Sequence, residues 1–126
     1  MPAEKVKILI ADDNPNIRTS LQDILTDKGY EVGLVNDGYE LWAYFLAKKV
    51  DILILDLMMP GRDGLEMLLP IKGISPGTKI IVYTAFQRFE KSFHHIEVDR
   101  FLLKTVGADK LCESIEELCK TIQEAG

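Results

Sequence analysis

Four short apolar segments of this chain are each followed by polar side chains that could do chemistry. The segments span 8–11, 52–55, 80–83 and 101–103, and the residues that follow them are Asp12 with Asp13, Asp56, Thr84 and Lys104. If the segments are parallel strands of one sheet, their carboxyl ends meet at the edge where such sheets bind ligands. Three carboxylates, a hydroxyl and an ammonium group at one edge suit a divalent cation and a phosphoryl group.

The rest of the chain alternates between strand-like and helix-like patterns. Strands are predicted at 5–11, 31–35, 51–55, 79–83 and 100–103. A helix should begin at Asn14-Pro15, an N-cap residue followed by proline, and end at Gly29. Further helices are expected after Asp37-Gly38, from Leu65, and over the apolar stripe from Leu111 to Ile122. Pro70 should disturb the third helix unless it lies near an end.

Strands that alternate with helices indicate an α/β fold. We expect a doubly wound, five-stranded parallel sheet with helices on both faces. The length of 126 residues fits one domain, so we expect residues 1–126 to form it. A chain that is 47% hydrophobic and 28% charged has the composition of a globular domain.

Charge and hydropathy exclude several classes of partner. The net charge of −5 and the pI of about 5.0 argue against nucleic-acid binding within this chain, which needs clustered lysine and arginine. No apolar stretch resembles a signal peptide or reaches membrane-spanning length. The sequence therefore predicts a cytoplasmic location without membrane contact.

The polar residues at the strand ends make the chain resemble a receiver domain of the bacterial two-component response regulators. The resemblance covers nearly the whole length. It rests on Asp12-Asp13, on the segment 56–64 (DLMMPGRDG), on Tyr83-Thr84-Ala85, and on Phe101 with Lys104. It implies a flavodoxin-like sheet in the order 2-1-3-4-5.

The resemblance also implies a phosphoacceptor site. Asp56 would accept a phosphoryl group from a histidine kinase or a phosphotransfer protein. Mg²⁺ would be held by Asp13, Asp56 and the backbone carbonyl of Met58, with Asp12 acting through bound water. Lys104 would neutralise the transferring oxygens, a role that suits phosphoryl transfer to a carboxylate.

Two further residues are candidates for a switch. By resemblance, Thr84 would donate its hydroxyl to a phosphoryl oxygen, and Phe101 would turn inward on phosphorylation. An ordinary strand aromatic packed on its neighbours explains Phe101 equally well. Likewise, Asp12 and Asp13 taken alone could be an acidic pair favoured by a helix dipole.

The sequence departs from the family pattern near the fifth strand. Thr105 follows Lys104, where the family usually has a proline with a cis peptide bond, and this leaves the reach of the lysine open. Glu97-Val98 stands in place of a common Gly-Ala pair. Between Ala85 and Asp99 we expect only a short or irregular helix.

The sequence-based interpretation is a signalling receiver rather than an enzyme. Phosphorylation would alter the face made by the fourth and fifth strands and the helices that follow them, for a downstream protein target that the sequence does not identify. The chain could be a stand-alone regulator, a phosphorelay shuttle or part of a longer protein, and a homodimer stays open.

Three alternatives compete with this interpretation. A degenerate receiver could act as a docking or dimerisation module without phosphorylation. A hydrolase of the haloacid dehalogenase type needs a second acid two residues after its nucleophile, where this chain has Met58. A flavodoxin should have hydroxyls and glycines after its first strand, where this chain has 12–15 (DDNP).

Overall fold

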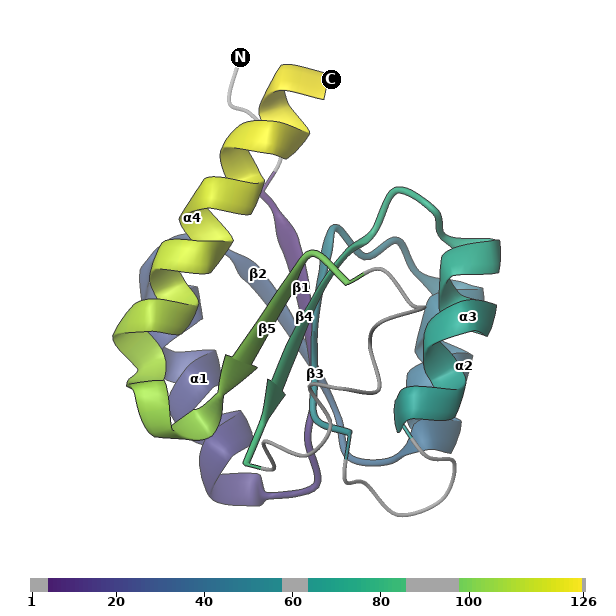
Figure 1. The fold of residues 1–126 in the computed structure, drawn as a ribbon, viewed down its shortest axis with the longest axis horizontal. Coiled ribbons are helices and arrows are strands. Elements are labelled where there is room, and N and C mark those ends of the chain that lie inside the picture. Colours follow the sequence, from purple (N-terminus) through teal and green to yellow (C-terminus); the bar gives the residue numbers. More distant parts are fainter. Residues whose placement is uncertain (1–4, 58–63, 86–97, 126) are drawn as a thin grey trace.

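A computed structural model of the chain describes residues 5–57, 64–85 and 98–125. They form a parallel sheet between two layers of helices (Figure 1). The strands are β1 (Lys7–Ala11), β2 (Glu31–Val35), β3 (Ile52–Leu55), β4 (Lys79–Thr84) and β5 (Arg100–Leu103). The helices are α1 (Pro15–Asp27), α2 (Gly38–Ala47), α3 (Gly64–Ile74) and α4 (Gly107–Ala125), with a 3₁₀ turn at Lys104–Val106. The strand order β2-β1-β3-β4-β5 confirms the predicted fold.

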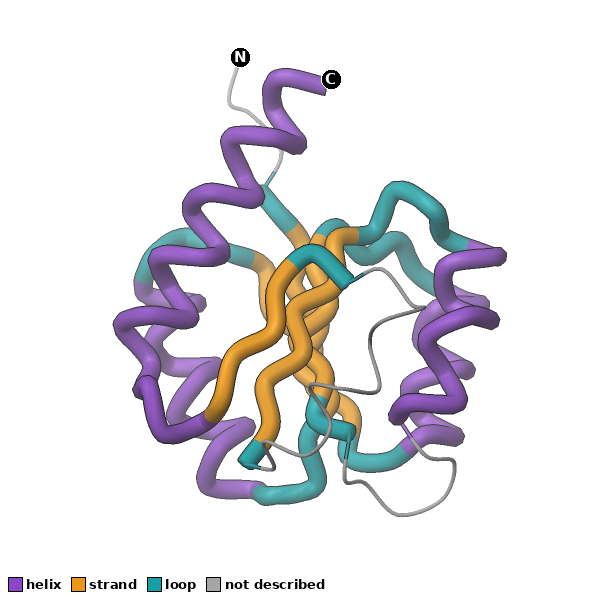
Figure 2. The backbone as a smooth tube through the Cα atoms, viewed as in Figure 1, coloured by secondary structure: helices purple, strands orange, loops and turns teal. Residues whose placement is uncertain are grey.

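Apolar clusters fill the space on both faces of the sheet. Every residue of β3 is buried, as expected for a central strand covered on both sides. Alternate strand residues pack against α2 and α3 on one face, where Leu53 lies with Leu41 and Met67. On the other face Ile54 packs in a cluster that includes residues of α1 and α4. The tube in Figure 2 shows the two helical layers separated by the sheet.

The first helix begins where the sequence predicted, immediately after the two aspartates. The Asn14 side chain accepts hydrogen bonds from the backbone N–H groups of Asn16 and Ile17, at 2.9 and 3.4 Å, and Pro15 occupies the first helical position. This cap fixes the turn that follows β1. The residues before it, Asp12 and Asp13, are therefore held at the carboxyl edge of the sheet.

The register brings the strand ends level with one another. Ala11 pairs with Leu55, Leu55 pairs with Val82, and two residues further along β4 Thr84 pairs with Leu103. The backbone N–H of Asp56 donates to the carbonyl of Ala11 over 2.9 Å. Residues that follow these strands consequently lie side by side along one edge.

The expectation for Pro70 was wrong, because α3 continues through it to Ile74. A proline here removes the hydrogen bond to the Glu66 carbonyl. Glu66 is exposed, so water can reach that turn, while Met67, Leu68 and Ile71 hold the other side of the helix in the core. Packing therefore outweighs the local preference.

Two further sequence predictions concern the segment before β5 and the absence of membrane-spanning segments. The segment predicted to hold a short helix before β5 falls on residues 86–97, which lie outside the described residues. Among the described helices, none combines the length and the apolar character needed to cross a bilayer.

Candidate functional site at the carboxyl edge of the sheet

Three carboxylates meet at the carboxyl edge. Asp12, Asp13 and Asp56 each place an oxygen so that the three atoms lie within 4.8 Å of one another. Asp12 and Asp56 are buried, at 3% and 5% exposed, whereas Asp13 is exposed. Close carboxylates repel one another, so the cluster needs positive charge nearby.

Part of that positive charge comes from Lys104. Its Nζ atom lies 2.7 Å from Oδ2 of Asp12 and 3.0 Å from Oδ2 of Asp56. The side chain is only 17% exposed, so water screens these contacts weakly. Three carboxylates and one ammonium still leave about two net negative charges, which is the charge that a divalent cation balances.

The contacts of Lys104 also change its own proton affinity. Burial of the side chain lowers the pKa, but hydrogen bonds and charge attraction from Asp12 and Asp56 outweigh burial, and the pKa is raised overall. Lys104 therefore stays cationic near neutral pH. An ammonium that keeps its charge is suited to neutralise an anion at this edge.

Asp12 is held by two more contacts. Its Oδ1 atom accepts the backbone N–H of Asn14 over 2.9 Å, and its backbone carbonyl accepts from Nη1 of Arg18 over 2.7 Å. Because the other oxygen of Asp12 faces Lys104, both carboxylate oxygens already have donors. Arg18 was not singled out from the sequence, since only the fold brings it to the residue six positions before it.

The hydroxyl candidate and the aromatic candidate lie on neighbouring strands. Thr84 is wholly buried at the end of β4. Phe101 pairs with Val82 and packs half-buried against the cluster under α2 and α3. Because alternate residues of a strand share a face, Thr84 and Val82 lie on the same side of β4. Phe101 and Thr84 therefore occupy the same side of the sheet.

The departure at Thr105 does not keep the lysine from the acidic cluster. Residues Lys104–Val106 form a 3₁₀ turn directly after β5, and the described residues contain no cis peptide bond. The side chain of Lys104 nevertheless reaches both Asp12 and Asp56. Met58, the predicted source of a backbone carbonyl ligand, lies outside the described residues.

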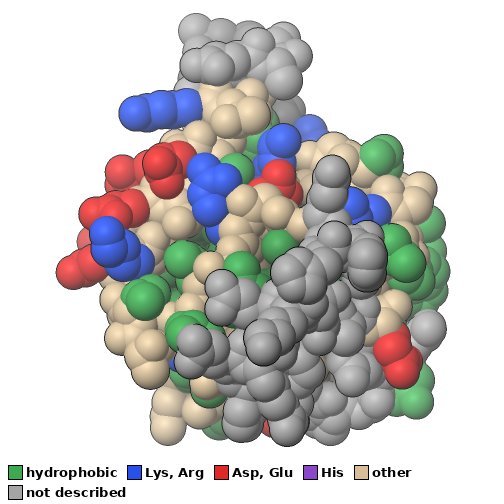
Figure 3. All heavy atoms as spheres, in the orientation of Figure 1, with side chains coloured by type: hydrophobic (Ala, Val, Ile, Leu, Met, Phe, Trp, Pro, Cys, Tyr) green, Lys and Arg blue, Asp and Glu red, His purple; other side chains and the backbone are tan. Residues whose placement is uncertain are grey.

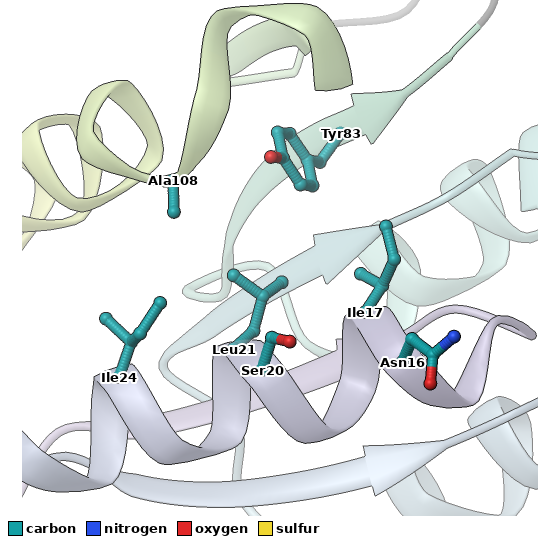
Figure 4. Close-up of a pocket in the computed structure, with 7 residues that line it drawn as sticks. All are labelled: Asn16, Ile17, Ser20, Leu21, Ile24, Tyr83 and Ala108. Carbon is teal, nitrogen blue, oxygen red and sulfur yellow. The ribbon is translucent and has the colours of Figure 1, made fainter.

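A groove lies beside this cluster, between α1, β4 and α4 (Figure 4). Its volume is about 230 Å³, and it is lined by Asn16, Ile17, Ser20, Leu21, Ile24, Tyr83 and Ala108. The lining residues come from elements that adjoin the site residues. Asn16 follows the two aspartates, Tyr83 precedes Thr84, and Ala108 lies shortly after Lys104. The groove therefore opens close to the carboxyl edge.

Comparisons with known proteins agree with this arrangement. Residues 8–116 match the family model of the response regulator receiver domain. The chain is 40% identical over 117 residues to the response regulator MprA of Mycobacterium tuberculosis, covering 91% of this chain and 51% of that protein. It is 31% identical over 124 residues to the transcriptional regulatory protein ZraR of Salmonella typhimurium, covering 97% of this chain and 28% of that protein. The chain thus spans about half or less of these curated relatives.

Solved structures give the same result. Response regulator TrrA of Thermotoga maritima, in complex with Mg²⁺-BeF, matches with a TM-score of 0.83 and 34% identity, covering 90% of this chain and 98% of that one. A CheY-like receiver domain protein of Methanospirillum hungatei matches with a TM-score of 0.91 and 28% identity, covering 98% and 100%.

Proposed function

The chain belongs to the response regulator receiver domain family, and we propose that Asp56 is its phosphoacceptor. One observation carries the proposal: the buried Asp56 carboxylate lies 3.0 Å from the Lys104 ammonium, within the cluster that it forms with Asp12 and Asp13. This carboxylate is buried at the carboxyl edge of a parallel sheet and has a cation beside it. Such a carboxylate is suited to phosphoryl transfer.

The donor set fits Mg²⁺. Hard oxygen ligands, an exposed carboxylate open to solvent and two unbalanced negative charges match a cation that keeps several of its waters. We propose that Asp13, Asp56 and the Met58 carbonyl hold the ion, and that Asp12 acts through water, since both its carboxylate oxygens already have donors. When bound, Mg²⁺ supplies positive charge that offsets the phosphoryl oxygens.

The reaction follows from the charges. A carboxylate oxygen of Asp56 attacks the phosphorus of a phosphohistidine, the new O–P bond forms, and the N–P bond breaks with its electron pair left on the imidazole. Lys104 keeps its proton throughout and shifts its hydrogen bond from the Asp56 carboxylate to a phosphoryl oxygen. Asp12 keeps the lysine near the site during this change.

The response to phosphorylation is proposed to start at Thr84. Its hydroxyl would donate to a phosphoryl oxygen, and Phe101, on the same side of the sheet, would repack as the end of β4 moves. The output face would then be formed by β4, β5 and the segments that follow them. A histidine kinase or a phosphotransfer protein would be the donor, and a downstream protein would be the target.

Phosphate uptake from a small donor tests the proposal. The chain is incubated with acetyl phosphate and Mg²⁺, and the phosphorylated fraction is measured by intact mass. Asp56→Asn should abolish uptake, because the amide is a poor nucleophile and carries no charge. Asp23→Asn, a matched change of an exposed aspartate on α1, should label as the parent does.

Two results would count against the proposal. If the parent chain takes up no phosphate with Mg²⁺ present, the degenerate receiver is the better interpretation. If Asp56→Asn labels as fully as Asp23→Asn, another residue is the acceptor. Stability of each variant is checked by circular dichroism, so that loss of uptake is not confused with loss of fold.

A further inference from the structure

The outer surface of α2 and α3 is unusually apolar. Four of the five large hydrophobic side chains exposed in the described parts of the chain lie on these two helices: Tyr39, Leu46, Leu69 and Ile74. Tyr39, Leu46 and Leu69 are each more than 60% exposed. Figure 3 shows hydrophobic side chains along its right-hand margin, where Figure 1 places α2 and α3. We name this surface the α2–α3 face.

The composition of α2 adds to the apolar character of the α2–α3 face. Glu40 is the one charged residue among its ten, and Leu41 and Phe45 already form the side that packs on the sheet. A helix lying on a sheet normally carries polar residues on its other side. Here Tyr39, Ala43 and Leu46 follow at a spacing of four and three residues, so the solvent side of α2 presents a second apolar stripe.

The two ends of the α2–α3 face carry charges of opposite sign. Glu40 and Glu66 lie in the first turns of α2 and α3. Lys72 lies in the last turn of α3. Lys48 directly follows α2, but its Nζ atom lies over the ring of Tyr44, 5.3 Å from the ring centroid, on the flank of α2 that contacts β2, so it does not belong to this face. Each of α2 and α3 connects one strand to the next strand along the chain, and both helices lie on the same face of the parallel sheet. The two helices therefore run in the same direction. The acidic end of the face is therefore common to both helices, and Lys72 makes the opposite end basic.

This pattern is complementary to itself in one orientation. We propose that the α2–α3 face binds a second copy of this chain, with the two-fold axis perpendicular to the helices. That axis places α2 against α2 of the partner in antiparallel fashion, and α3 against α3. Glu66 of each copy then faces Lys72 of the other across the interface. A two-fold axis parallel to the helices would instead set Glu40 of one copy against Glu66 of the other, acid against acid.

The dimensions of the face indicate a weak complex. With 10 and 11 residues, α2 and α3 are about 15 and 16 Å long. Two such helices side by side place the interface in the class below about 1,200 Å² of buried surface, which is typical of transient complexes. The association does not require phosphate on Asp56, so it stands independently of the proposed function.

Sedimentation velocity tests the self-association directly. The unphosphorylated chain is measured from about 10 µM to about 1 mM, the range in which a weak interface of this size is populated. We expect the sedimentation coefficient to rise toward that of a dimer. Leu46→Glu and Leu69→Glu should each weaken the association at least about tenfold, because each would bury a charge against apolar surface. Thr19→Glu, on the exposed side of α1, should change nothing.

A charge exchange tests the orientation. Glu66→Lys and Lys72→Glu should each weaken homodimers by about threefold to tenfold, because each variant sets like charges against one another twice. An equimolar mixture of the two variants should recover association, since every contact in the mixed dimer again joins opposite charges. Circular dichroism verifies that both variants are folded.

The outcomes separate the proposal from its rivals. A parent chain that stays monomeric at about 1 mM overturns the dimer proposal outright. A dimer that is insensitive to Leu46→Glu and Leu69→Glu lies on another face and also overturns it. A mixture that associates no better than the single variants overturns the antiparallel orientation on which the charge argument rests.

Discussion

Lys104 lies closer to Asp12 than to the proposed phosphoacceptor: its Nζ atom is 2.7 Å from Oδ2 of Asp12 and 3.0 Å from Oδ2 of Asp56. Asp12 is itself held by Asn14 and Arg18. The lysine can therefore release Asp56 and keep one partner. The proposed function then gives the three acids different roles: Asp12 as the anchor of the lysine, Asp56 as the nucleophile, and Asp13 as the exposed metal ligand.

The first prediction concerns Asp13, the exposed residue that we propose as a metal ligand. Mg²⁺ should raise the free energy of unfolding, by about 1.4 kcal/mol at ten times its dissociation constant, because it binds the folded chain only. Asp13→Asn should remove most of this gain and change little in the absence of metal, since the side chain is exposed. Urea unfolding with and without Mg²⁺, at matched ionic strength, measures both effects. An equal gain in the parent chain and the variant would place the metal elsewhere.

The second prediction concerns the lysine. Lys104→Met should lower the free energy of unfolding by about 1–3 kcal/mol, because it leaves the buried carboxylates of Asp12 and Asp56 without their cation. Mg²⁺ should restore more stability in this variant than in the parent chain. Lys110→Met is the matched control, since Lys110 forms an exposed pair with Glu113 that contributes little. Equal stabilities for the two variants would contradict the electrostatic argument.

Much of the fold could be read from the sequence. Apolar runs that end in Asp12, Asp56, Thr84 and Lys104 predicted four of the strands, and the strand order follows the family pattern. The Asn14-Pro15 signal located the start of α1, because capping depends on neighbours along the chain. Such features depend on residues close together in the chain, so they can be predicted from the sequence.

Features that depend on distant contacts were not predictable. The helix through Pro70 is one, because tertiary packing of Met67 and Ile71 decides it. Gly33 is another: a Cβ there would overlap the hydroxyl oxygen of Tyr44, a close approach of β2 and α2 that no sequence pattern reveals. The distances from Lys104 to its two acids likewise needed the structure, since the family proline is replaced by Thr105.

The third prediction concerns pH. Burial raises the pKa of Tyr30 to about 12 from 10.0, and Cys119, whose thiol lies 3.9 Å from the hydroxyl, adds to this. The unfolded chain loses the phenol proton first, so stability from this group is complete below pH 10 and falls as the pH rises toward 12. Tyr30→Phe should therefore lose less stability than the parent between about pH 8 and about pH 11.

Urea unfolding at both pH values, with Tyr39→Phe as an exposed control, measures the difference. A loss in Tyr30→Phe as steep as in the parent chain would assign the effect to other groups.

The last prediction concerns the groove between α1, β4 and α4. A protein that brings phosphohistidine to Asp56 must cover the carboxyl edge, and this apolar groove opens beside it. Ser20 is exposed on the groove wall, so Ser20→Arg should obstruct a protein donor without disturbing the buried site. We expect phosphoryl transfer from a phosphorylated histidine phosphotransfer protein to slow at least about tenfold, as for a substitution at an interface hot spot. Uptake from acetyl phosphate should be unchanged, because a small donor needs no docking surface. Thr26→Arg, on the same helix and outside the groove, is the control for added charge. Equal slowing with both donors would mean that Ser20→Arg disturbs the site itself, and no slowing with either would exclude the groove as the docking surface.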